Sequence, residues 1–248
     1  MAMNDSSKPL KTANPATAPA PAGSSAIDAF LGSAKRLAPV ADSDPRGRLV
    51  FALDATMSRQ PTWDLACRLQ ADMFGATASL AGLAVQLVYF RGFDECRSSR
   101  WVADAAALTS LMGRIDCRGG QTQIARVLRH VRTEAGRTPV RALVYVGDAM
   151  EEPVDELCAV AGELGLLGVK AFMFHEGADA DAGRAFREIA RLTGGAYAHF
   201  DAGAAGRLAG LLRAAAAYAS GGTVALHRLA SREGEARRLL TAMPGGGR

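Results

Sequence analysis

The feature that most constrains the fold is a regular alternation of short apolar runs with longer amphipathic segments between residues 47 and 220. The apolar runs have the length and composition of buried strands, and they span residues 49–54, 85–90, 140–146, 169–174 and 196–200. The amphipathic segments have helical length and one apolar face, and they span residues 62–74, 104–112, 122–134, 153–164, 182–192 and 204–219. This alternation predicts an α/β fold with a mostly parallel central sheet and helices on both faces.

One connection departs from the alternation. After the second run, only a polar bend at residues 92–96 precedes the next strand-like piece at residues 98–102. A bend of this length is too short for the helical crossover that a parallel neighbour requires. We therefore expect residues 98–102 to form one antiparallel edge strand.

Carboxylates and hydroxyls follow the ends of two predicted strands and open one predicted helix. In an open parallel sheet, ligands bind beyond the carboxyl ends of the strands, where these segments lie. Carboxylates gathered there without basic neighbours repel one another, whereas carboxylate and hydroxyl oxygens suit a hard divalent cation such as Mg²⁺. The sequence therefore predicts a cation site made of Asp54, Thr56, Ser58, Thr122 and Asp148.

These five positions resemble the metal ion-dependent adhesion site (MIDAS) of the von Willebrand factor A (VWA) domain family. That site reads Asp-x-Ser-x-Ser, then a Thr after a glycine-rich turn, then an Asp that ends a strand. The site here is a variant, because Thr56 replaces the first Ser and Gly147-Asp148-Ala149 replaces the common Thr-Asp-Gly. The resemblance covers roughly residues 47–220 and implies a three-layer, Rossmann-like VWA fold.

The resemblance also implies a function. In VWA domains the hydroxyls contact the metal directly, the aspartates often act through water, and one coordination position stays open for an acidic group of a partner. We therefore expect a protein-binding module that uses Mg²⁺ or Mn²⁺ to bind an Asp or Glu of another protein. Such modules often work beside AAA ATPases or other assembly machinery, which suggests the kind of partner.

Two other interpretations of the same residues remain open. In the first, Asp54 and Asp148 only cap helix N-termini and the hydroxyls satisfy loop amides, without any metal. In the second, the protein is a metal-free scaffold that binds partners through the hairpin between Phe90 and Trp101 or through its tails. The acidic pair Glu151 and Glu152 also has two possible roles, since it could strengthen a cation site or simply stabilise a first helical turn.

The sequence does not favour an enzyme. An aspartyl phosphotransfer site at Asp54 would need a second carboxylate two residues later, where Thr56 stands. It would also need a lysine near the phosphate, and Lys170 is the only lysine after Lys35. The chain contains no nucleophile elbow, P-loop or dinucleotide fingerprint.

Composition narrows the partners and the compartment. A net charge of +4, spread over 22% charged residues of both signs, does not indicate nucleic-acid binding. No apolar stretch approaches the roughly 18 to 20 residues that cross a bilayer, and the N-terminus lacks a signal-peptide core. The four cysteines are far apart and form no metal or redox pair. We therefore expect a cytoplasmic protein that does not bind a membrane.

The composition also divides the chain into regions. Residues 1–24 repeat Ala, Pro, Ser and Thr and are predicted to be disordered. Residues 25–46 are predicted to form a short helix and a linker, and residues 47–220 the VWA-like domain. Residues 221–248 carry several arginines and are predicted to form a basic C-terminal tail, with a helix before a glycine-rich end.

Overall fold

A mixed sheet of six strands organises the residues that the computed structural model describes, which are 46–59, 82–201 and 204–245. The strand order is β3-β2-β1-β4-β5-β6, and all neighbouring pairs are parallel except β2 and β3. The strands are β1 Gly47–Asp54, β2 Leu83–Arg91, β3 Glu95–Ser98, β4 Ala142–Gly147, β5 Lys170–Glu176 and β6 Ala196–Phe200. The predicted fold class, a mostly parallel sheet with one antiparallel edge strand, is confirmed.

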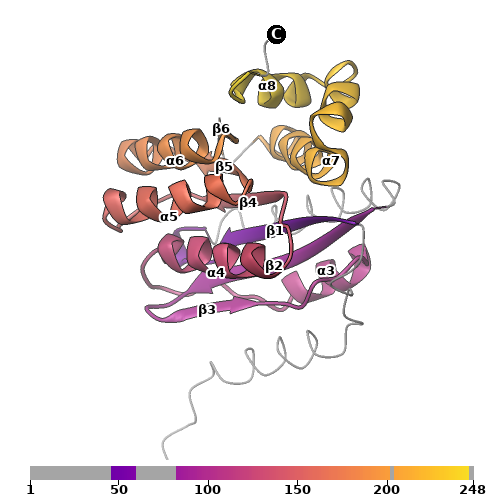
Figure 1. Ribbon diagram of the computed structural model, residues 1–248. Helices are drawn as coiled ribbons and strands as arrows, with labels where there is room; N and C mark the ends of the chain where they lie inside the picture. The colour runs from indigo at the N-terminus through magenta and orange to yellow at the C-terminus, as the bar shows by residue number, and fades with distance from the viewer. Residues whose placement is uncertain (1–45, 60–81, 202–203, 246–248) are drawn as a thin grey trace, which may run out of the picture.

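Helices cover both faces of this sheet, which gives three layers (Figure 1). One face packs against α4 Ile124–Arg137, α5 Val154–Leu166 and α6 Ala180–Thr193. The other face packs against α3 Ala105–Met112, α7 Ala205–Ala230 and α8 Gly234–Ala242. A short 3-10 helix, η1 Met57–Arg59, follows β1.

Strand β1 shows why the sheet needs a layer on each side. Every residue of β1 is buried. Phe51 and Leu53 belong to the core on the α7 side, whereas Val50 and Ala52 belong to the core on the α4 side. Because successive side chains of a strand point to opposite faces, a continuous apolar run requires cover on both.

The edge hairpin differs from its prediction. The antiparallel partner of β2 is β3 at Glu95–Ser98, not residues 98–102, and Val102 adds only an isolated bridge to Val85. The turn is shorter than expected because Gly92 has φ = 61°, a left-handed conformation that lets the chain reverse at once. Arg91 then pairs with Glu95 across the turn.

The chain after Ser220 forms helices. Helix α7 continues through a kink at Gly221 and Gly222, where Gly222 has φ = 65° and ψ = −157°, values that only glycine adopts readily. Leu226 beyond the kink and Leu239 of α8 are buried in the same core as Phe51. Residues 221–243, which lie in the region predicted to be a basic tail, thus contribute apolar side chains to the domain.

Some sequence-based expectations fall outside the described residues. These are the disordered segment 1–24, most of the helix and linker 25–46, and the helix at residues 62–74. The division of the chain at residues 24, 46 and 220 stays a prediction. Within the described part of the chain, no helix combines the length and apolar character needed to cross a membrane.

Candidate metal-binding site

The first candidate segment is the loop that leaves β1. Asp54 is fully buried, and its Oδ1 accepts a hydrogen bond from the Thr56 backbone N at 2.8 Å. This local bond turns the chain sharply, as aspartates at strand ends commonly do. The turn brings Thr56 Oγ1 to within 3.0 Å of Ser58 Oγ. Asp54 therefore holds two hydroxyl oxygens side by side.

The second segment, residues 116–123, lies against the first. Thr56 and Arg118 form a parallel bridge, and the Arg118 backbone N donates to the Ala55 carbonyl at 3.0 Å. Thr122 is buried, with 6% of its surface exposed, immediately before α4 begins. The glycine-rich turn lets the two loops approach closely, because a Cβ at Gly120 would lie 2.1 Å from a backbone oxygen of the β2–β3 turn.

The third segment, the loop after β4, binds the second through two carboxylates. Glu151 Oε2 accepts from the Thr122 backbone N at 2.8 Å, and the Glu151 backbone N donates to Thr122 Oγ1 at 3.1 Å. Glu152 accepts from the backbone N atoms of Ile124 and Ala125, at 2.5 and 2.8 Å. Helix α4 lacks a side-chain cap from its own N-cap residue, Gln123, so these carboxylates cap it from another loop.

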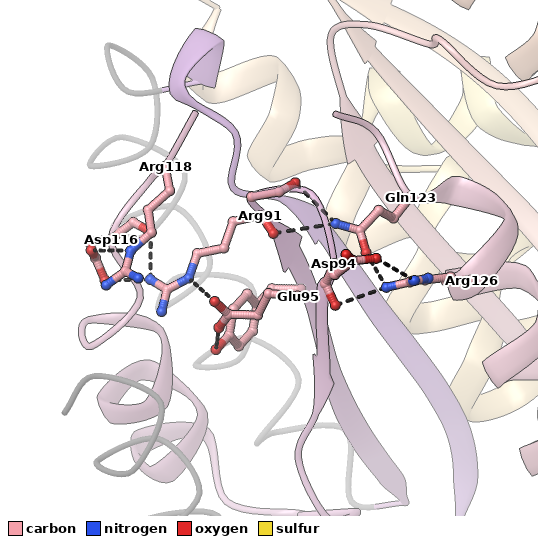
Figure 2. A network of polar contacts seen from close by, with 9 residues as sticks. Arg91, Asp94, Glu95, Asp116, Arg118, Gln123 and Arg126 are labelled. Atoms are coloured by element: carbon pink, nitrogen blue, oxygen red, sulfur yellow. Dashed lines mark hydrogen bonds and ion pairs between the residues drawn. The ribbon is translucent and has the colours of Figure 1, made fainter. Parts of the chain in front are cut away.

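A network of polar contacts fixes the second segment to the edge hairpin (Figure 2). Arg91, with 1% of its side chain exposed, donates to both the carbonyl and the carboxylate of Asp116 and forms an ion pair with Glu95 at 3.1 Å. Gln123 Nε2 donates to the backbone carbonyls of Arg91 and Gly92 at 3.3 and 3.2 Å. Both ends of the segment that carries Thr122 are thus attached to the carboxyl end of β2.

Burial and hydrogen bonding act in opposite directions on Asp116. Burial alone would raise the pKa of this carboxyl group, but the hydrogen bonds from Arg91 and Arg118 hold its pKa below the ordinary value. Asp116 is therefore an anion at neutral pH, which keeps Arg118 beside it. Farther along the same edge, Arg126 pairs with Asp94 at 2.8 Å. These arginines are thus held by carboxylates outside the predicted set of five.

Asp148, the fifth predicted residue, lies where β4 meets β5. It follows Gly147, which pairs with His175 in the sheet register. Asp148 Oδ1 is buried and has no hydrogen-bond partner among the described residues. Burial lowers the pKa of the His175 imidazole, His199 lowers it further, and the Asp148 backbone opposes the shift. The ring beside Asp148 is therefore neutral at physiological pH and does not neutralise its carboxylate.

The backbone therefore brings the three predicted segments to one edge of the sheet. The register of β1 with β4, in which Leu53 pairs with Val146, places the ends of these two strands side by side. The hydrogen bonds between Thr122 and Glu151 join the second segment to the third. The five side chains are engaged differently. Asp54, Thr56 and Ser58 make hydrogen bonds within the first loop, and Thr122 accepts one from Glu151 of the third segment. Asp148 Oδ1 has no hydrogen-bond partner among the described residues.

The donor set suits a hard cation. Among the described residues, no group of three or more His, Cys, Asp or Glu side chains is arranged to hold a metal ion, so a cation here would depend on the hydroxyls. Oxygens that neighbour one another around an octahedral ion, each at about 2.1 Å from it, lie about 3.0 Å apart. The separation of Thr56 Oγ1 and Ser58 Oγ matches this spacing. This separation is that of a hydrogen bond between the two hydroxyls, and it also suits two adjacent ligands of one divalent cation.

Sequence reasoning missed the roles of three residues at this edge. The sequence left open whether Glu151 and Glu152 strengthen a cation site or stabilise the first turn of the helix that follows them, and the structure shows that they bind the N-terminal end of α4. Arg91 lies in the hairpin between Phe90 and Trp101, and no role was predicted for its side chain. A signal for the two glutamates does exist, because a helix that precedes a parallel strand begins at the edge where the neighbouring strands end.

The architecture is that of VWA domains, and the chain has the VWA fold. The SpRpn10 VWA domain superposes with a TM-score of 0.54 and 11% identity over 64% of this chain and 90% of that chain. An aerotolerance-related membrane protein of Bacteroides fragilis gives a TM-score of 0.53 and 17% identity over 68% of this chain and 98% of that one. Proximal thread matrix protein 1 of the mussel byssus, in a structure with a zinc-occupied MIDAS motif, gives a TM-score of 0.56 and 17% identity over 71% and 46%.

Comparisons of the sequence itself give no relative. No protein-family model matches the chain, and no curated protein matches it. The likeness to the solved structures, at 11 to 17% identity, therefore concerns the fold.

Proposed function

We propose that the protein is a non-enzymatic, cytoplasmic protein-binding module that uses a divalent cation. Mg²⁺ or Mn²⁺ would be held by Asp54, Thr56, Ser58, Thr122 and Asp148, and an Asp or Glu of a partner protein would complete the site. The observation that carries the proposal is the 3.0 Å separation of Thr56 Oγ1 and Ser58 Oγ, which suits two adjacent ligands of one ion.

The residues of the chain have distinct tasks in this mechanism. Asp54 orients the first loop by accepting the Thr56 backbone N–H. Thr122 is oriented by the Glu151 backbone N–H, which leaves its hydroxyl oxygen a second lone pair. Asp148 offers a buried oxygen without a hydrogen-bond partner among the described residues. The bound cation would supply positive charge and an open coordination position for the partner's carboxylate.

The structural neighbours support two general parts of this proposal, a protein-binding module and a divalent cation. The matched mussel protein carries zinc at a MIDAS motif, which makes a divalent cation reasonable for a protein of this fold. The VWA domain of SpRpn10 has the same architecture at nearly full length. The kind of partner that we propose is an AAA ATPase or another component of assembly machinery, and the proposal includes neither nucleic acid nor a membrane.

Calorimetric titration of the protein with Mn²⁺ and Mg²⁺ tests the cation. We expect Asp54→Ala to abolish binding, but this buried change could also unfold the loop. The matched pair Thr56→Ser and Thr56→Val separates the two effects, because Val keeps the shape of Thr without its oxygen. Thr56→Val should weaken cation binding by at least about tenfold. Changing a residue that only supports a metal ligand already weakens metal binding by about 10- to 100-fold, and loss of a ligand should cost at least as much. Equal affinity of Thr56→Val and the wild type would remove the metal from the proposal.

Affinity purification with and without EDTA tests the partner. Proteins that bind through the proposed site should be lost when EDTA is present and should return with added Mn²⁺. They should also be lost from Thr56→Val but retained by Thr56→Ser. Capture that is identical with and without the chelator would contradict recognition through a cation.

A second candidate, the metal-free scaffold, receives support from one residue. Phe93, at the tip of the β2–β3 hairpin, has 73% of its surface exposed. Phe90 and Trp101 are buried, and Trp101 Nε1 donates to Glu134 at 2.7 Å, so neither provides a binding surface. In this case, partner capture should survive EDTA and Thr56→Val but fail in Phe93→Ser.

A further inference from the structure

Large hydrophobic side chains that stay exposed are unevenly distributed over the described residues. They are Met57, Phe93, Val154, Leu166, Leu167 and Val224. Met57, Phe93 and Val154 are 54%, 73% and 40% exposed. Met57 and Phe93 follow the carboxyl ends of β1 and β2, and Val154 is the first residue of α5, which follows β4. Single exposed hydrophobic residues are common, but three that follow the carboxyl ends of neighbouring strands, where the proposed cation site lies, form a distinct group. We call these three residues the apolar rim.

The residues of the apolar rim follow loops that contact one segment, residues 118–125. Met57 follows Thr56, which forms a bridge with the first residue of this segment. Phe93 follows Gly92, whose carbonyl accepts from the Gln121 backbone N at 3.2 Å. Val154 follows the loop whose two glutamates bind the start of α4. Each rim residue is thus adjacent in sequence, or nearly so, to a residue that contacts the segment carrying Thr122.

The charges at this edge restrict what can bind there. Asp54, Asp148, Glu151 and Glu152 contribute carboxylates, whereas Arg118 and Arg126 are paired with Asp116 and Asp94. A divalent cation would attract one carboxylate of a partner to the open coordination position. A second acidic side chain on the partner would instead meet the carboxylates of the protein, and such like-charge contacts are unfavourable.

We propose that the apolar rim recognises a partner segment in which a single Asp or Glu is flanked by large apolar side chains. The acidic residue would complete the cation site, and the apolar residues would cover Met57, Phe93 and Val154. Aromatic residues often dominate binding interfaces, and the flexible Met side chain adapts to partners of different shape. This inference rests on the proposed function, because the cation positions the acidic residue.

A displayed peptide library tests the inference. The library would carry a fixed central Asp with three randomised residues on each side, and the full chain would select from it in Mn²⁺. We expect Leu, Ile, Phe, Met or Trp to be enriched beside the Asp, and further acidic residues to be depleted. The variant Met57→Ser/Phe93→Ser should bind the selected peptides about tenfold more weakly or worse, the loss of one interface hot spot.

Two controls accompany this measurement. Leu166→Ser changes a residue that is 91% exposed at the other end of α5, and it should leave peptide binding unchanged. Calorimetric titration with Mn²⁺ should give the same affinity for the rim variant and the wild type, since neither Met57 nor Phe93 offers a ligand in the proposed site.

The possible outcomes separate the rim from the cation. If Mn²⁺ binds but the peptides show no apolar preference, or if the rim variant binds them as well as the wild type, the rim proposal is overturned and the proposed function stands. The rim proposal is likewise overturned if Mn²⁺ binds and no peptide is selected. If Mn²⁺ does not bind, or if EDTA leaves peptide selection unchanged, recognition through a cation is overturned together with the inference that rests on it.

Discussion

At the residue scale, two neighbouring glycines before Thr122 have different roles. A Cβ at Gly120 would lie 2.1 to 2.4 Å from backbone atoms of Gly92, whereas a Cβ at Gly119 would have no atom within 4 Å. Neither glycine has a positive φ. The constraint on Gly120 is therefore the space between two loops, and the constraint on Gly119 is much weaker.

Gly120→Ala should accordingly lower the free energy of unfolding by about 1–3 kcal/mol, the usual cost of placing extra atoms in a packed region. Gly119→Ala is the matched control and should change stability by less than about 0.5 kcal/mol. Urea denaturation of both variants measures the difference. Equal stability of the two variants would show that the close contact between Gly120 and Gly92 does not contribute to the stability of the fold.

Residue types alone indicated the chemistry of the site but not its hydrogen bonds. The sequence left open whether these residues form a cation site or cap helices and loops. The hydrogen bonds do not assign all of the residues to one of these two roles. Asp54 accepts a loop amide and Thr122 accepts another, as the capping interpretation expects. The hydroxyls of Thr56 and Ser58 bond to each other, which is compatible with both interpretations. Such pairwise contacts depend on loop conformation, which residue spacing does not determine.

At the scale of secondary structure, the parallel strands were easier to predict than the antiparallel edge strand. Strands β1, β2, β4 and β5 have long apolar runs, because both faces are covered. Strand β6, at the other edge, is partly buried. The bounds of all five differ from the prediction by a few residues at most. Strand β3, with the sequence Glu-Cys-Arg-Ser, is only partly buried and has no apolar run to reveal it. Helix α4 begins two residues after the predicted start, because its cap comes from Glu152 on a distant loop.

The external cap of α4 gives a prediction for stability. Glu152→Ala removes the acceptor of two backbone N–H groups and should lower the free energy of unfolding by about 1–2 kcal/mol, as the loss of a good helix cap does. Glu156→Ala removes an exposed carboxylate that pairs with Arg129, and it should cost less than about 1 kcal/mol. Chemical denaturation compares the two variants, and a larger effect of Glu156→Ala would contradict the cap.

The contact between Arg91 and Asp116 gives a prediction for acid. The pKa of Asp116 is below its ordinary value, so its stabilising contribution is complete above the unfolded-state pKa of about 4 and is lost as the pH falls through the lowered folded-state value. Asp116→Asn should be less stable than the wild type at pH 7, and this difference should shrink as the pH falls below about 4. Thermal unfolding of both proteins at a series of pH values measures this difference in stability. A difference that grows in acid would contradict a stabilising contact between Arg91 and Asp116.

At the scale of the whole molecule, the C-terminal helices pack against the sheet and against each other. Helix α8 packs along α7, and a Cβ at Gly210 would lie 2.9 Å from the Glu235 side chain, so a small residue allows the close approach. Arg213 of α7 pairs with Glu233 at 3.1 Å. The sequence of this region suggested a basic tail, because its arginines are conspicuous. Several of its apolar residues, Leu226 and Leu239 among them, are nevertheless buried.

Leu239→Ala should therefore destabilise the entire domain. The expected loss is about 2–5 kcal/mol, the range for removing a buried leucine side chain. Val224→Ala, which changes a side chain that is 61% exposed in the second part of α7, should have little effect. A single cooperative transition at lower denaturant concentration is the expected result for Leu239→Ala. An unchanged midpoint would mean that α8 contributes nothing to the fold.

The contacts between the three loops also bear on the thermodynamics of recognition. Thr122 is bound to the loop after β4, Thr56 is bridged to Arg118, and Gln121 is bonded to Gly92 before any ligand arrives. A receptor assembled in advance loses little conformational entropy when it binds, so less of the interaction energy is spent on ordering loops. Under the proposed function, association at this edge should then require the removal of water from the proposed cation and from the partner's carboxylate, with small changes of loop shape.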